Sequence, residues 1–216
     1  MTMKTGYKIP KLLLLSVPLL LAACTPLGMA TGTGAAVGMA AAGEGGLKGT
    51  ASDIRIKALI SDAWFKYDIK TFSKLSLTVD QGRVLITGVV QDPEARVQAV
   101  RLAWQVDGVK QVINEIRVAE GEGLPGFVRD AWITTRLRTA LTFDAEVQSI
   151  NYSIETVQGT VYLMGVAENQ AELSRVTEIA RTIPNVKQVI SYVKRRGEPV
   201  DTPPNDPVWE KPEQLP

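Results

Sequence analysis

The sequence contains two copies of one segment, and the copies are separated by 77 residues without a gap. Residues 53–118 match residues 130–195 at 15 identical positions. QGRVLITGV recurs as QGTVYLMGV, and GVKQVI recurs as NVKQVI. Each copy is about 65 residues long, which is near the lower size limit for an independent core. The repeat therefore predicts two similar small domains in tandem.

The order of elements within a copy can be inferred from its pattern. A helix comes first, with Asp53 as its expected N-cap and apolar residues at helical spacing: Ile56, Ile60, Ala63 and Trp64. Two strands, LSLTV and RVLITGVV, follow and are joined by a Gln-Gly turn. A second helix begins near Pro93, and KQVINEIRV forms a third strand. We expect an α+β fold in which each αββαβ copy packs a three-stranded mixed sheet on two helices.

The start of the chain is typical of a bacterial secretion signal. Three lysines precede the apolar run of residues 12–21, and LAAC follows at residues 21–24. The run is too short to span a bilayer, which requires about 20 apolar residues. LAAC resembles a lipobox, which implies cleavage after residue 23 and lipidation of Cys24. The alternative is a plain signal peptide with an incidental cysteine.

Composition excludes several classes of site. The chain has no histidine, and Cys24 is its single cysteine. Cys-His and Ser-His-Asp catalysis, thiolate zinc sites and intrachain disulfides are therefore excluded. No spaced carboxylate cluster indicates an acid–base pair or a metal site, so we expect no catalytic residues, no metal, no cofactor and no enzyme activity. A hydrolase that uses only carboxylate side chains is one hypothesis for function, beside the lipid-binding and protein-interaction hypotheses given below.

Charge argues against a nucleic-acid partner. The chain has 24 basic and 23 acidic side chains, and loss of the three leader lysines leaves 21 basic side chains. A general nucleic-acid binder would show a broad basic excess.

Two segments outside the copies have biased composition. Residues 24–50 are rich in Gly and Ala, which predicts a flexible tether. Close packing of small residues in a membrane is the alternative for this segment. Residues 196–216 are polar and rich in Pro, which predicts a disordered tail.

The lipobox, the tether and two αββαβ copies with motifs similar to QG.V.L.G.V and V..V.N.I together resemble the BON domain. The arrangement is similar to dual-BON-domain outer-membrane lipoproteins of the DolP type. The resemblance covers roughly residues 21–195 and implies BON domains at residues 51–119 and 127–195. It also implies attachment to the periplasmic face of the outer membrane, because no Asp follows Cys24 to suggest inner-membrane retention.

The first helices of the two copies differ on the side away from the apolar stripe. Positions held by Arg55, Leu59, Asp62 and Lys66 in copy one hold Trp132, Arg136, Thr139 and Phe143 in copy two. Trp132 lies about 125° from the buried stripe at 3.6 residues per turn. Exposed aromatic residues usually mark a contact surface, and nearby arginines suit anionic headgroups. The candidate phospholipid-binding residues are Arg129, Trp132, Arg136, Thr139, Leu141 and Phe143.

The resemblance agrees with this site, since it implies binding of anionic phospholipid by the first helix of the second copy. The matching Trp132 would enter the lipid, with Arg136 and Leu141 nearby, and phosphatidylglycerol or cardiolipin would be the partner. Two alternatives remain. Trp132 could pack between the copies. The chain could instead be a protein-interaction module, which docks an outer-membrane assembly partner through the same face or a sheet edge.

Overall fold

The computed structural model describes residues 46–121 and 123–200. The predicted signal peptide, Cys24, most of the predicted tether and the tail beyond residue 200 lie outside these residues. The expectations for those segments therefore stay predictions.

Both copies have the predicted αββαβ order. Copy one consists of α2 (Gly46–Phe72), β1 (Leu75–Asp80), β2 (Arg83–Val90), α3 (Pro93–Trp104) and β3 (Gln111–Val118). Copy two consists of α4 (Gly123–Phe143), a 3₁₀ turn (Ser149–Asn151), β4 (Tyr152–Val157), β5 (Thr160–Ala167), α5 (Gln170–Thr182) and β6 (Gln188–Arg195). In each sheet the middle strand, β2 or β5, pairs antiparallel with the strand before it and parallel with the strand after it. The expected three-stranded mixed sheets are confirmed.

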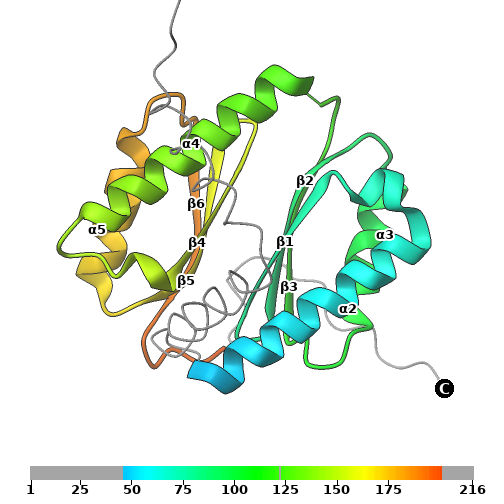
Figure 1. Ribbon diagram of the computed structural model, residues 1–216, viewed down its shortest axis with the longest axis horizontal. Helices are drawn as coiled ribbons and strands as arrows, with labels where there is room; N and C mark the ends of the chain where they lie inside the picture. The colour runs from blue at the N-terminus through cyan, green and yellow to red at the C-terminus, as the bar shows by residue number, and fades with distance from the viewer. Residues whose placement is uncertain (1–45, 122, 201–216) are drawn as a thin grey trace, which may run out of the picture. The chain divides into compact units, whose positions relative to one another are not determined.

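In each copy the two helices cover one face of the sheet, as Figure 1 shows for α2 with α3 and for α4 with α5. The apolar stripe of α2 enters the first core, where Ile56 and Ile60 are buried. Trp64 is buried there too, and its Nε1 donates to the carbonyl of Ala99 on α3 (3.1 Å). In copy two Ile133 and Leu137 take the same places. The predicted stripes are therefore the helix faces that dock on the sheets.

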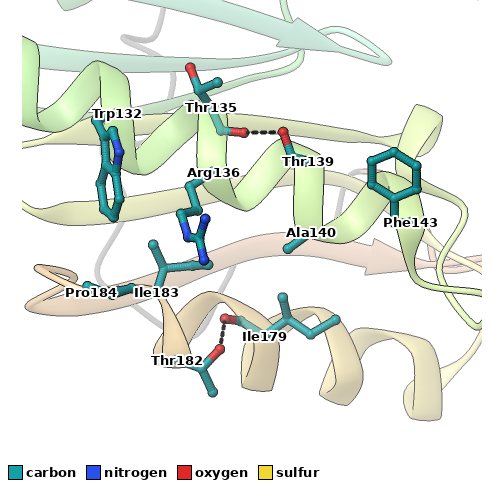
Figure 2. A pocket seen from close by; sticks show the side chains of 10 residues that line it. All are labelled: Trp132, Thr135, Arg136, Thr139, Ala140, Phe143, Ile179, Thr182, Ile183 and Pro184. Carbon is teal, nitrogen blue, oxygen red and sulfur yellow. Dashed lines mark hydrogen bonds between the residues drawn. The ribbon is translucent and has the colours of Figure 1, made fainter.

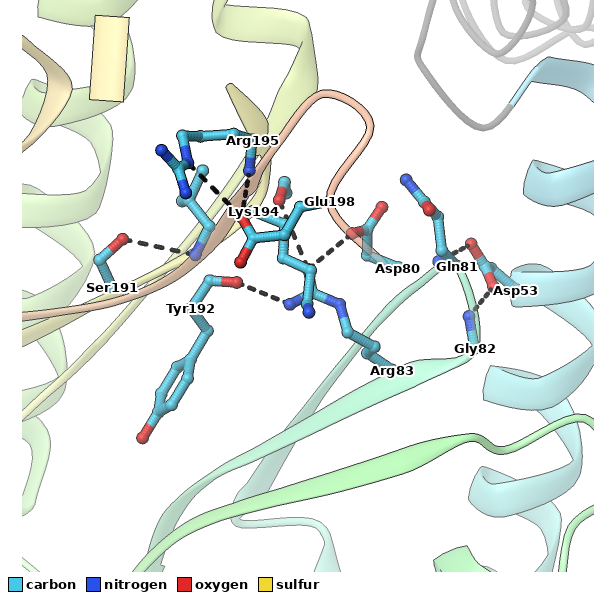
Figure 3. Close-up of polar contacts among 12 residues, drawn as sticks. Asp53, Asp80, Gln81, Gly82, Arg83, Ser191, Tyr192, Lys194, Arg195 and Glu198 are labelled. Atoms are coloured by element: carbon cyan, nitrogen blue, oxygen red, sulfur yellow. Dashed lines mark hydrogen bonds and ion pairs between the residues drawn. The ribbon is translucent and has the colours of Figure 1, made fainter. Parts of the chain in front are cut away.

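The expected N-cap role of Asp53 is wrong. Because α2 begins at Gly46, Asp53 lies two turns inside the helix. Its carboxylate instead accepts hydrogen bonds from the backbone N–H groups of Gln81 (2.8 Å) and Gly82 (2.9 Å), as Figure 3 shows. Burial raises the pKa of Asp53 above its ordinary value, and the two backbone hydrogen bonds offset part of that effect. The aspartate therefore fastens the helix to the hairpin turn.

Copy two repeats this contact. The carboxylate of Asp130 accepts from the N–H groups of Gln158 (2.6 Å) and Gly159 (2.9 Å). Both turn residues have positive φ, 51° and 80°, which is the conformation of a two-residue hairpin loop. This turn points its two N–H groups at one acceptor. The contact gives a physical reason why the aspartate and the Gln-Gly pair are identical in both copies.

The second face of each sheet is also buried, and the two copies cover each other there with both apolar and polar side chains. Leu85 and Ile113 of copy one form a buried cluster with Tyr162 and Met164 of copy two. Every residue of β5 is buried, as are all but one of β2. Polar contacts accompany the cluster. The Arg117 guanidinium donates to the Thr160 hydroxyl (2.6 Å), and the Tyr192 hydroxyl donates to Glu115.

Contacts between the copies join positions that correspond to each other in the repeat. Thr78 donates to Glu155 (3.4 Å), and Tyr192 donates to Glu115, and each of these pairs is separated by 77 residues. Equivalent residues contact each other when two copies are related by a two-fold axis, as in an isologous dimer. The tandem copies therefore pack like the subunits of a homodimer.

Arg83 is the buried charge in this contact between copies. Its guanidinium donates to the carbonyls of Tyr192 (2.8 Å) and Gly165 (3.4 Å) and forms an ion pair with Asp80 (3.0 Å), as Figure 3 shows in part. The side chain is almost fully buried. These contacts tie the start of β2 to the strands of copy two.

We expect Asp130→Ala to lower the free energy of unfolding by about 2 kcal/mol, because two turn N–H groups lose an ionised acceptor. Chemical denaturation of the chain measures this loss. Asp62→Ala is the control, since its exposed carboxylate pairs only with Lys66 and should change stability by less than about 0.5 kcal/mol. Equal effects of the two substitutions would contradict the role of the turn contact.

We expect Leu85→Asp and Met164→Asp each to separate the copies, because both put an unpaired charge into the cluster between the sheets. Small-angle scattering should show a larger radius of gyration than that of the unchanged chain. Val97→Asp on the exposed surface of α3 is the control. An unchanged radius of gyration in both core variants would show that the copies do not depend on this cluster.

Candidate functional site

The outer face of α4 exposes several large apolar side chains, with threonine and arginine residues between Trp132 and Phe143. Large side chains are exposed at both ends and in the middle of this helix, namely Leu124, Phe127, Val128, Trp132 and Phe143. Trp132 is 44% exposed and Phe143 is 84% exposed. The 21 residues of α4 span about 31 Å at 1.5 Å per residue. Such a surface on a soluble domain usually marks a contact with a partner or a membrane.

A groove of about 570 Å³ runs between α4 and α5, as Figure 2 shows. Its α4 side is lined by Trp132, Thr135, Arg136, Thr139, Ala140 and Phe143. Its α5 side is lined by Ile179, Thr182, Ile183 and Pro184. Arg136 is the only charged side chain among these residues. The groove therefore combines apolar walls with one cation.

Arg136 is placed to use its charge on a ligand. Its guanidinium carbon lies 5.9 Å from the centre of the Trp132 ring, which is cation–π distance. The side chain is exposed, and no described carboxylate forms an ion pair with it. A guanidinium of this kind binds phosphate through parallel N–H donors.

The groove hydroxyls have already used their hydrogens. Thr135, Thr139 and Thr182 each donate to a backbone carbonyl of their own helix, at 2.7–2.9 Å. Their oxygens therefore remain as acceptors. Around one cation, these acceptors suit a ligand that carries both a phosphate and hydroxyl or amine donors.

Copy one has a different chemistry at the equivalent positions. Arg55, Asp62, Lys66 and Asp107 occupy the positions of Trp132, Thr139, Phe143 and Pro184. The single groove cation, Arg136, corresponds to Leu59. Over the positions that line the groove, copy one thus has four charged side chains and copy two has one. The apolar groove is therefore a feature of copy two.

The structure brings together four of the predicted site residues: Trp132, Arg136, Thr139 and Phe143 line one groove. Trp132 lies beside α5 of its own copy and is not part of the cluster between the sheets. Cys24 lies outside the described residues, so its lipidation stays a prediction.

Leu141 does not belong to this surface. It is 1% exposed and packs in the core of copy two, because it continues the stripe of Ile133 and Leu137. Its predicted contact with lipid is therefore wrong. Arg129 does not line the groove either, and its guanidinium lies 3.7 Å from Asp130.

Three exposed residues of α4 were missed by the sequence analysis: Leu124, Phe127 and Val128. They precede Arg129 in the segment LPGFV, where Pro125 and Gly126 suggest a linker. A proline in the first turn is compatible with a helix because its missing N–H has no partner there. A search for apolar residues four apart, from Leu124 to Val128 to Trp132, would have found Leu124 and Val128.

Two further observations limit the kinds of site. Across residues 46–121 and 123–200, no helix is long and apolar enough to cross a membrane. The same ranges contain no group of three acidic or cysteine side chains that could hold a metal ion.

The BON domain family model matches residues 52–120 and 129–197. An uncharacterized protein in the gshII 5′ region of Anaplasma centrale is 43% identical over 143 residues, which cover 66% of this chain and 93% of that protein. The outer membrane lipoprotein DolP of Haemophilus influenzae is 29% identical over 126 residues, or 58% of this chain and 65% of that protein. Osmotically-inducible protein Y of Escherichia coli is 29% identical over 146 residues, or 67% of this chain and 73% of that protein.

Proposed function

The chain belongs to the BON-domain family, and from this and the exposed face of α4 we propose a membrane-binding function. In this proposal the protein is a lipoprotein attached to the periplasmic face of the outer membrane, without enzyme activity. It binds anionic phospholipid through α4 and so supports envelope integrity. The likeness to DolP, an outer membrane lipoprotein, supports the location. The single observation that carries the binding role is the exposed apolar face of α4 beside Arg136.

The shape of α4 suits the surface of a bilayer. A helix that lies in the membrane interface buries an apolar face in the boundary between headgroups and acyl chains. Trp132 is the residue type that prefers this depth, because its ring is apolar and its N–H stays near water. Leu124 and Phe143 extend the contact to both ends of the helix.

The charge of the groove selects anionic lipid. Arg136 contacts the phosphate, and a basic side chain near an anionic surface contributes about 1 kcal/mol. The acceptor oxygens of Thr135, Thr139 and Thr182 receive donors of the headgroup. Phosphatidylglycerol and cardiolipin offer both a phosphate and glycerol hydroxyls, so they are the proposed ligands.

Lipidation of Cys24 provides the permanent attachment in this proposal. Each buried CH₂ of an acyl chain contributes about 0.8 kcal/mol, so several chains hold a protein stably. The contact through α4 is then a reversible addition, which orients copy two on the headgroups.

We expect the chain that starts at Thr25, which lacks the lipidation site, to bind vesicles of phosphatidylglycerol or cardiolipin. Trp132→Glu should weaken this binding at least about tenfold, because it places a charge where the ring would enter the interface. Vesicle co-sedimentation measures the effect. Val97→Glu is the control, since it puts the same charge in place of an exposed apolar residue of α3, outside the proposed contact.

Equal binding by the Trp132 variant and the unchanged chain would exclude this site. Photo-crosslinking from position 132 in intact cells tests the alternative partner. Adducts chiefly with one protein, such as outer-membrane assembly machinery, would favour the protein-interaction hypothesis over lipid.

We expect Leu124→Glu and Phe143→Glu each to weaken vesicle binding, because the two residues lie at opposite ends of the exposed face. The same co-sedimentation assay measures both. If Trp132 acted alone as a wedge, both end variants would bind like the unchanged chain. Val97→Glu is the control, because it puts the same charge in place of an exposed apolar residue on α3, away from this face.

A further inference from the structure

The first helix of copy one also carries an exposed apolar stripe, which the proposed function does not use. Ile54, Ala58, Ser61 and Phe65 follow each other on α2 and are all exposed. Ile54 is 64% exposed and Phe65 is 63% exposed. At 100° per residue the four lie within about 60° of one another and about 130° from the mean direction of the buried side chains.

The order of side chains along this stripe is self-complementary. It begins with a large residue, Ile54, continues with the small Ala58 and Ser61, and ends with the large Phe65. If a second α2 lies antiparallel across it, Ile54 meets Phe65 of the other copy and Ala58 meets Ser61. The small residues would then lie at the crossing point and let the two backbones approach, while the large residues fill the space on either side.

Charges beside the stripe fit the same arrangement. Arg55 and Asp62 lie on one flank of the stripe, and both are exposed. In the antiparallel pair, Arg55 of one chain lies about 3 Å along the helix axis from Asp62 of the other chain, at 1.5 Å per residue. Lys66 of the other chain lies at the same axial distance from Arg55, but it is turned about 40° farther from the stripe than Asp62. The opposite charge is therefore the nearer one on this flank, once on each side of the two-fold axis. The existing ion pair of Asp62 with Lys66 is exposed and contributes little.

We propose that the Ile54–Phe65 face of α2 binds the same face of a second copy of this chain, in an antiparallel arrangement. The order of side chains and the position of Arg55 and Asp62 are the observations that select a second copy. Four side chains per chain are a small contact compared with stable dimer interfaces. The association is therefore weak in dilute solution and depends on chains concentrated at one membrane surface.

The test uses the full chain in bacterial envelopes. Ser61→Cys places a thiol near the two-fold axis, and a short thiol–thiol crosslinker should give a dimer adduct. Ser52→Cys is the matched control, because Ser52 is exposed on α2 but points about 180° away from Ser61. The unchanged chain, with Cys24 as its single cysteine, gives the background.

Second substitutions in the Ser61→Cys chain identify the contact. Phe65→Glu should lower the dimer adduct about tenfold, because each contact would bury an unpaired carboxylate. Arg55→Asp should also lower it, and Arg55→Asp combined with Asp62→Arg should restore it. Trp132→Glu should leave the adduct unchanged, so failure of lipid binding by α4 and failure of this proposal give different results.

Three results would overturn the proposal. These are an equal yield of dimer from Ser52→Cys and Ser61→Cys, a yield that Phe65→Glu does not change, and adducts of Ser61→Cys with a different protein only. Circular dichroism of the Phe65→Glu chain confirms that it folds, which is expected because Phe65 lies outside the core.

Discussion

The strands β2 and β5 are almost entirely buried on both faces, and the rest of the structure depends on this. Two helices can cover only one face of a three-stranded sheet. The other face would leave Leu85, Ile113, Tyr162 and Met164 in water, at a cost of about 25 cal/mol for each Å² of apolar surface. Each copy covers this face of the other, so the duplication is part of the core. A copy of about 65 residues is near the size where one core alone is marginal, which fits this mutual dependence.

The two-fold arrangement decides which surfaces stay free. Because equivalent positions such as Glu115 and Tyr192 meet, the sheets provide the contact between copies, and the helices are not needed for it. The buried stripes of α2 and α4 hold these helices in the fold, and their outer faces are not needed for it. Such faces can change without loss of stability, since surface substitutions usually alter stability by less than about 0.5 kcal/mol. Buried Arg83 is an exception to the symmetry, because Thr160 stands at its equivalent position.

Much of the fold was predictable because both copies carry the same local signals. The Gln-Gly turn, the start of α3 at Pro93 and the apolar stripes all agree with the structure. The role of Asp53 was not predictable from one helix, since an aspartate before an apolar stripe is also the pattern of an N-cap. Its partner is a turn 28 residues away, and only the fold brings the two together. For the site, the aromatic positions were accessible by comparison of the copies. Leu141 was included because the family resemblance implied it, although its helical spacing from Ile133 and Leu137 places it in the buried stripe.

The comparison of the copies also explains why a lipid contact would lie in copy two. Both helix pairs dock on their sheets through equivalent buried residues, so the side chains on their outer faces make the difference. In copy one, Arg55, Asp62 and Lys66 would have to leave water to enter a bilayer interface, and desolvation of charges opposes that. In copy two the same three positions hold Trp132, Thr139 and Phe143, which lose little or gain on leaving water. In the proposed contact, the single cation of the groove, Arg136, would then add selectivity for anionic headgroups, which its long side chain could reach from the interface.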